Sequence, residues 1–129
     1  MNGLAFTPDD AELVVAQTVH HRLVAISIAH GVVGSPRVYC ELPPNVNPDG
    51  MCFDSEGYLF VAGSAGDTLA VVDPNRRVAD VVDVAAGSCP TNVCLLDDRL
   101  WVTLGLAGAV GFLATPSSAH HLAAGRQPA

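Results

Sequence analysis

Two polar residues that each precede a glycine at the start of an apolar segment are the positions of this chain best suited to chemistry. Asp49 lies within the stretch 47–54, and Asn2 precedes Gly3 in a shorter version of the same unit. A third version begins at Thr91. Carboxylate and carboxamide oxygens are ligands that hard divalent cations prefer, and a carboxylate can also act as a general base. A glycine next to such a group allows close approach of a ligand or of another backbone.

The three versions belong to an internal repeat, which predicts the fold. The units start at residues 2, 49 and 91. Each contains an apolar strand, a turn rich in Asp, Gly or Pro, and a second apolar strand. Third strands are expected at 22–28, 68–73 and 109–114, and outer fourth strands at 37–42 and 78–84. Repeats of about 40–50 residues that contain several short strands are typical of β-propellers.

We therefore predict an all-β fold, a partial and about three-bladed β-propeller made of four-stranded antiparallel blades. The propeller segment is expected at 1–116, with blades at about 2–46, 47–88 and 89–116. The third unit has no convincing fourth strand. A propeller closes with about 4–8 blades, so three blades leave edges unpaired. Unpaired edges predict self-association or membership of a larger propeller.

The two ends of the chain carry separate predictions. Residues 117–129 are rich in Ser, Ala and Gly and are expected to form a flexible C-terminal tail. A short helix over 118–124 is the alternative. Met1 adjoins the first unit directly, so we expect the chain to start within the fold. No basic region followed by an apolar stretch is found at the N-terminus, and a secretory signal is not predicted.

Propeller geometry predicts which polar residues meet. Alternate loops lie on the same face of the disc, which places Asn2, Asp49 and Thr91 around the central axis on one face. Three polar groups at one axial point predict a site for calcium, magnesium or manganese, and zinc needs fewer ligands. Asn47 and His20 join this face and are weaker candidates for substrate binding, together with Thr91. Asp-Gly and Asn-Gly are also common turn sequences, so a purely structural role is the alternative.

Charge and composition exclude several classes of partner. The formal net charge is −7 with only six Lys and Arg, which argues against nucleic acid. No apolar run of about 18 residues is present, so no membrane helix is predicted. The four cysteines fit neither a paired zinc site nor a secreted disulfide framework, which favours a cytoplasmic protein. Cys52, Cys94 and Trp101 lie in apolar strands and are expected in the core.

Four stretches together carry a resemblance to a known family: Asn2-Gly3-Leu4 with Thr7-Pro8-Asp9; Asn47-Pro48-Asp49-Gly50-Met51-Cys52; Asp54-Ser55-Glu56-Gly57-Tyr58-Leu59-Phe60-Val61-Ala62; and Pro90-Thr91-Asn92-Val93-Cys94 with Leu100-Trp101-Val102-Thr103. In order and spacing they resemble the family of regucalcin (senescence marker protein), gluconolactonase and luciferin-regenerating enzyme. The resemblance covers about residues 2–114. It implies that the chain corresponds to the C-terminal half of a six-bladed propeller.

The resemblance also implies a site and an activity. Members of the family hold one divalent cation near the axis through a glutamate of the first blade, the asparagine of an Asn-Gly motif and the aspartate of a Pro-Asp-Gly motif. The last two match Asn2 and Asp49, and the aspartate is also the implied general base. The implied activity is metal-dependent hydrolysis of a sugar lactone or another lactone, in which the metal polarises the carbonyl and the base activates water.

The chain departs from the family pattern at two places. No residue matches the glutamate of the first blade, and Gln17 stands where many relatives have an aspartate. We therefore expect a fragment of a lactone hydrolase that lacks the N-terminal half of the site. The alternative is a non-catalytic propeller fragment that acts as a structural or interaction module.

Overall fold

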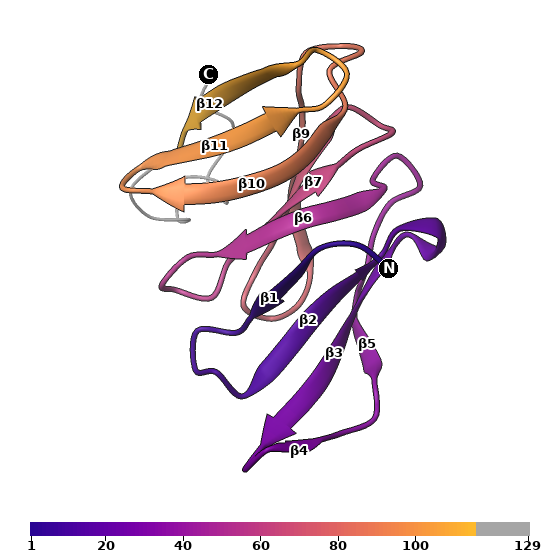
Figure 1. Cartoon of the computed structure of the whole chain (residues 1–129), viewed down its shortest axis with the longest axis vertical. Coiled ribbons are helices and arrows are strands. Elements are labelled where there is room, and N and C mark those ends of the chain that lie inside the picture. The colour runs from indigo at the N-terminus through magenta and orange to yellow at the C-terminus, as the bar shows by residue number, and fades with distance from the viewer. Residues whose placement is uncertain (116–129) are drawn as a thin grey trace.

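The computed structural model describes residues 1–115, which form three antiparallel sheets stacked side by side (Figure 1). The first sheet contains β1 (Leu4–Phe6), β2 (Glu12–Gln17), β3 (Arg22–Ala29), β4 (Val32–Val33) and β5 (Arg37–Glu41). The second contains β6 (Pro48–Phe53), β7 (Leu59–Gly63), β8 (Thr68–Val72) and β9 (Val78–Asp83). The third contains β10 (Pro90–Leu96), β11 (Arg99–Leu104) and β12 (Ala109–Ala114).

This arrangement confirms the predicted all-β, partial propeller. In each sheet the chain runs outward from the innermost strand through successive hairpins, and every pairing is antiparallel. Within the described residues the third sheet has three strands, as the sequence suggested. The short 3₁₀ helix η1 (Thr18–His20) and the strand β4 were not predicted. The expected tail at 117–129 and its helical alternative lie outside the described residues.

Aspartate side chains close the turns at the outer ends of the hairpins. The Asp54 carboxylate accepts hydrogen bonds from the backbone N–H groups of Glu56 and Tyr58, both at 2.9 Å. Asp73 accepts one from the N–H of Arg77 at 3.0 Å. Carboxylates of this kind replace backbone partners in tight turns. The Pro-Asp and Asp-Ser-Glu-Gly signals in the sequence therefore mark turns.

The core consists of two apolar layers between sheets. One layer lies between the first and second sheets and includes Val14, Leu23 and Leu59, which are fully buried. The other lies between the second and third sheets and includes Phe60 and Val102. Because successive residues of a strand point to opposite faces, the second sheet contributes to both layers.

Glycine allows the innermost strands to approach one another at the axis. A Cβ at Gly3 would lie 2.7 Å from the Cα of Gly50, and a Cβ at Gly50 would lie 2.6 Å from the Cα of Asn92. Side-chain atoms do not tolerate such distances. The two glycines therefore determine how closely β6 lies between β1 and β10 (Figure 1).

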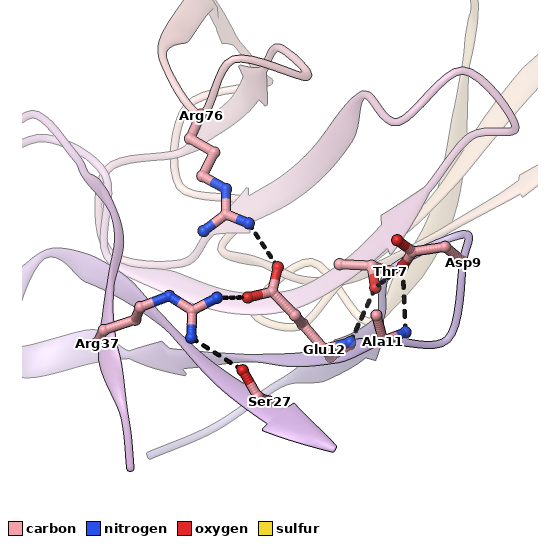
Figure 2. A network of polar contacts seen from close by, with 7 residues as sticks. All are labelled: Thr7, Asp9, Ala11, Glu12, Ser27, Arg37 and Arg76. Carbon is pink, nitrogen blue, oxygen red and sulfur yellow. Dashed lines mark hydrogen bonds and ion pairs between the residues drawn. The ribbon is translucent and has the colours of Figure 1, made fainter. Parts of the chain in front are cut away.

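A buried carboxylate joins the first two sheets at the opposite ends of their strands (Figure 2). Glu12 of β2 is buried and forms ion pairs with Arg37 of the same sheet and with Arg76 from the turn between β8 and β9. The Arg76 guanidinium also lies 4.6 Å from the centre of the Tyr39 ring, within the range of a cation–π contact. Arg37 donates a further hydrogen bond to the Ser27 hydroxyl at 3.0 Å.

Two of the residues expected in the core lie elsewhere. Cys94 is exposed, and Trp101 is partly exposed and packs against Phe112 with ring centres 5.2 Å apart. Cys52 is partly buried against the second apolar layer, as expected. Burial raises the pKa of the Cys40 thiol to about 11 and that of Cys52 to about 12, so both stay protonated at neutral pH. Within residues 1–115 no helix is long and apolar enough to span a membrane.

We predict that Gly50→Ala destabilises the fold by about 1–3 kcal/mol, because the added methyl group must displace the backbone of β10. Chemical denaturation measures the change in the free energy of unfolding. Gly111→Ala is the matched control, since its Cβ would meet only the flexible Leu104 side chain at 3.4 Å. Equal stability of the two variants would contradict the close approach at the axis.

We also predict that Glu12→Gln lowers the free energy of unfolding by about 1–3 kcal/mol. The change leaves two arginines without their shared anion, and their partial exposure to water keeps the loss below that of a fully buried pair. Glu56→Gln is the control, because Glu56 is exposed in the equivalent turn of the second sheet and should change stability by less than about 0.5 kcal/mol. A loss no larger than that of the control would show that the two ion pairs contribute nothing.

Candidate metal centre at the axial face

A chain of hydrogen bonds ties Asn2 to the second sheet. The Asn2 Nδ2 group donates to the Thr18 hydroxyl at 2.7 Å, and that hydroxyl donates to the Pro48 carbonyl at 2.7 Å. The Asn2 backbone N–H also donates to the Ala16 carbonyl at 3.1 Å. Because the amide nitrogen is the donor, the carboxamide oxygen of Asn2 remains an acceptor. Asn2 is therefore linked through Thr18 to Pro48, the residue that precedes Asp49 at the start of β6.

Asp49 lies in a β-bulge of the innermost strand of the second sheet. The register shifts between Pro48, opposite Gly63, and Met51, opposite Val61, so β6 carries one extra residue. A similar shift occurs in β10 between Pro90 and Asn92, where Thr91 is the extra residue. Bulges leave a residue outside the ladder and redirect its side chain, and they are frequent beside active sites.

The Asp49 carboxylate has no hydrogen-bond or ion-pair partner within the described residues. Its side chain is partly buried, and this desolvation alone raises the pKa of the carboxyl group above its ordinary value of 3.8. Asp67, on the same face, is a contrast. The backbone N–H groups of Cys89 and Gly87 donate to it at 2.8 and 2.7 Å and lower its pKa. Asp67 is thus a structural carboxylate, whereas Asp49 keeps its oxygens available for a ligand.

The three axial positions differ in how far their side chains are already engaged. The Thr91 hydroxyl lies 2.9 Å from that of Thr103, and the two share a hydrogen bond. Asn92, which stands where the earlier units have glycine, accepts a hydrogen bond from the N–H of Val93. Asn2 and Asp49 thus belong to neighbouring innermost segments of the first and second sheets, whereas Thr91 is paired within its own sheet.

The weaker candidates His20 and Asn47 differ in their surroundings. His20 is exposed in η1, and Asn47 acts through its backbone carbonyl, which accepts from the N–H of Ser64 at 2.9 Å. His21, the next residue, lies at a left-handed position, φ +49°, and its Nδ1 is 3.0 Å from the Val46 carbonyl oxygen. This contact joins the first sheet to the linker that precedes β6. No sequence signal distinguished the two histidines.

The donor set fits part of a site for a hard cation. The Asp49 carboxylate and the Asn2 carboxamide oxygen are suitable ligands. Among residues 1–115 no group of three or more His, Cys, Asp or Glu side chains gathers at one point. Gln17, at the position where the family resemblance implies an aspartate, is engaged as an acceptor from the Arg22 Nε at 2.6 Å. The described residues therefore offer two suitable oxygen groups, one from Asp49 and one from Asn2.

Comparisons with known proteins agree with the partial-propeller fold. The gluconolactonase of Xanthomonas campestris, described as important in glucose secondary metabolism, superposes with a TM-score of 0.74 and 29% sequence identity over 89% of this chain and 37% of its own. A luciferin-regenerating enzyme gives a TM-score of 0.70 with 23% identity, covering 81% of this chain and 38% of its own. The calcium-binding protein regucalcin of Agrobacterium tumefaciens gives 0.68 with 22% identity, covering 78% and 36%.

The chain spans less than two-fifths of the length of each of these three solved structures. A comparison with curated protein sequences gives no significant match. The family model described as the SMP-30/gluconolactonase/LRE-like region matches residues 1–105, which is most of the chain. The protein therefore belongs to the SMP-30/gluconolactonase/LRE-like family.

Proposed function

We propose that this chain carries part of the active site of a metal-dependent lactone hydrolase of gluconolactonase type. The observation that carries the proposal is the Asp49 carboxylate, which lies in a bulge of an innermost strand, desolvated and without a partner in the described residues. Leaving a carboxylate in this state costs stability, and such costs are typical of functional groups. Membership of the family supplies the reaction class.

Asp49 is the general base of this proposal. Burial raises the pKa of its carboxyl group, which makes it a stronger proton acceptor than an exposed aspartate. It takes a proton from water as the water oxygen attacks the lactone carbonyl carbon. The ring C–O bond then breaks, the leaving oxygen regains a proton, and the product is the hydroxy acid. Overall one water is added across one ester bond.

Asn2 and Asp49 would hold the divalent cation, whether calcium, zinc, magnesium or manganese. When bound, the cation acts as a Lewis acid that polarises a carbonyl oxygen. The chain's own contribution is to fix the two oxygens: Thr18 holds the Asn2 amide through a hydrogen bond, and the bulge holds Asp49. Two protein ligands imply weak binding, because affinity rises with ligand number and charge.

The substrate class follows from the family and from the chemistry of the site. We assign a sugar lactone or another small lactone, with the sugar acid as product. His20, Asn47 and Thr91 stay the candidates for substrate contacts. We also propose a cytoplasmic location, which the four free cysteines of the described region support. If the chain shows neither metal binding nor hydrolysis in the tests below, a non-catalytic structural or interaction module is the alternative function.

Metal binding is tested by thermal unfolding during titration with calcium or zinc. A ligand that binds only the folded state stabilises it and so raises the melting temperature. At a ligand concentration of one hundred times the Kd, the free energy of unfolding rises by about 2.7 kcal/mol. We expect a rise in the wild-type chain and its loss in Asp49→Asn. Asp83→Asn is the control, since Asp83 is exposed on the outer strand β9. An equal rise in all three proteins would refute the assignment of Asp49 as a ligand.

The same variants test hydrolysis, with release of acid from gluconolactone as the measurement. Asp49→Asn should abolish any metal-dependent hydrolysis, whereas Asp83→Asn should retain it. Metal binding without hydrolysis would favour a binding module over an enzyme.

Without metal, Asp49→Asn is expected to stabilise the chain at neutral pH. The folded state raises the pKa of Asp49, so the native protein binds more protons than the unfolded chain just above pH 3.8. Stability therefore falls as the pH rises through this window, and the cost persists at higher pH. Denaturation at several pH values in the presence of a chelator measures the difference, which should shrink as the pH falls below 3.8. A variant that is less stable than the wild type at pH 7 would contradict a desolvated, unpartnered carboxylate.

A further inference from the structure

The third sheet has an exposed apolar face. The equivalent faces of the first and second sheets are buried. Cys94, Trp101 and Phe112 are cross-strand neighbours on β10, β11 and β12, and Phe112 is 54% exposed. Leu96 and Val110 of the same sheet are exposed as well. We call this row, Cys94, Trp101 and Phe112, the trailing face.

The matching row of the second sheet shows what normally covers such a face. Cys52, Phe60 and Val71 are cross-strand neighbours on β6, β7 and β8, at the positions that Cys94, Trp101 and Phe112 occupy in the third sheet. They belong to the apolar layer against the third sheet, where Phe60 and Val71 are almost completely buried. A sheet of this fold therefore covers the trailing row of its neighbour.

The first sheet has the complementary exposed surface. Leu4 and Phe6 of β1 are 59% and 53% exposed, and we call this pair the leading face. Their counterparts in the second sheet, Met51 and Phe53, pack against the first sheet. Those in the third sheet, Val93 and Leu95, pack against the second. The leading row of each later sheet thus contacts the sheet before it, and only β1 lacks such a neighbour within residues 1–115.

We propose that two copies of this chain associate head to tail, each trailing face covering the leading face of the other. The contact repeats the packing that already joins the first to the second sheet and the second to the third. Because the described residues leave one face of each kind uncovered, a twofold arrangement covers both faces of both copies. Three sheets from each copy give six, within the range of about 4–8 blades that closes a propeller.

Closure would also bring a second Asn2 and a second Asp49 to the axis, which supplies the ligands that one chain lacks. At the new junction Asn92 stands where the internal junctions have Gly3 and Gly50. Its Oδ1 and Cγ lie against Gly50, at the internal junction between the second and third sheets. The apolar rows centred on Trp101 and Phe6 carry the new contact.

Sedimentation velocity over a range of concentrations, in buffer with a chelator, measures this association without reference to the lactonase proposal. We expect a species of twice the chain mass that does not grow further. Trp101 is the only tryptophan of the chain, so its emission should shift to shorter wavelength as the dimer forms. A monomer at every concentration, or a ladder of larger species, would overturn the proposal.

Substitutions on each face test the direction of packing. Phe112→Glu and Phe6→Glu should each weaken the dimer by more than about tenfold, because each places an unpaired charge in the contact. Leu106→Glu is the control, as Leu106 is 78% exposed in the turn between β11 and β12 and belongs to neither face. Circular dichroism of each variant checks that the fold is retained.

A mixture of the two variants separates head-to-tail from face-to-face contact. In a head-to-tail mixed dimer, the intact trailing face of the Phe6→Glu copy meets the intact leading face of the Phe112→Glu copy. One junction is then free of substitution, so the mixture should associate more tightly than either variant alone. If Phe6→Glu dimerises as well as the wild type, or if mixing brings no gain, the head-to-tail arrangement is wrong.

Discussion

The close approach of the innermost strands at the axis is the constraint on which the rest of this structure depends. Gly3 faces the backbone of Asp49 and Gly50, and Gly50 faces that of Asn92, at distances that admit no side chain. With the inner ends held together in this way, the sheets spread outward and their faces meet in two apolar layers. At the opposite ends of the strands, the ion pair between Glu12 and Arg76 joins the first sheet to the second. A side chain in place of either glycine would push the innermost strands apart and weaken the packing of the layers beside them.

The same constraint explains why a carboxylate is found at the axis without a partner. Each Asn-Gly or Asp-Gly pair places its polar residue immediately before the glycine that fits against the next strand. The bulge in β6 then removes Asp49 from the ladder, and no backbone N–H of residues 1–115 donates to its carboxylate. Asp67 shows that this face can provide two N–H donors where a carboxylate has a structural role. The lack of such donors distinguishes Asp49 from a carboxylate that closes a turn, and the dipeptide Asp-Gly alone does not make this distinction.

Local patterns in the sequence predicted most of the fold but not the contacts between sheets. The repeat of apolar strands and Asp-containing turns identified the hairpins, because turn chemistry and alternation act over a few residues. The Glu12 ion pairs escaped prediction because Arg76 is 64 residues away and no periodic signal links them. At the candidate site, Asn2 and Asp49 were placed on one face by the repeat. The hydrogen bonds of Thr18 and the role of His21 depend on loop conformation, which the sequence pattern does not determine.

Cys94 and Trp101 show a further limit, and it has a physical cause. An apolar strand pattern predicts that one face of the sheet is buried. It does not predict which neighbouring sheet, or which chain, buries that face. Cys52 and Cys94 occupy equivalent positions, and the difference in their exposure arises only because a third sheet follows the second and no fourth follows the third within the described residues. In a repeat protein each unit is stabilised by its neighbours. An exposed apolar face on the last described sheet therefore indicates that another sheet packs against it. The row formed by Trp101 and Phe112 is such a face.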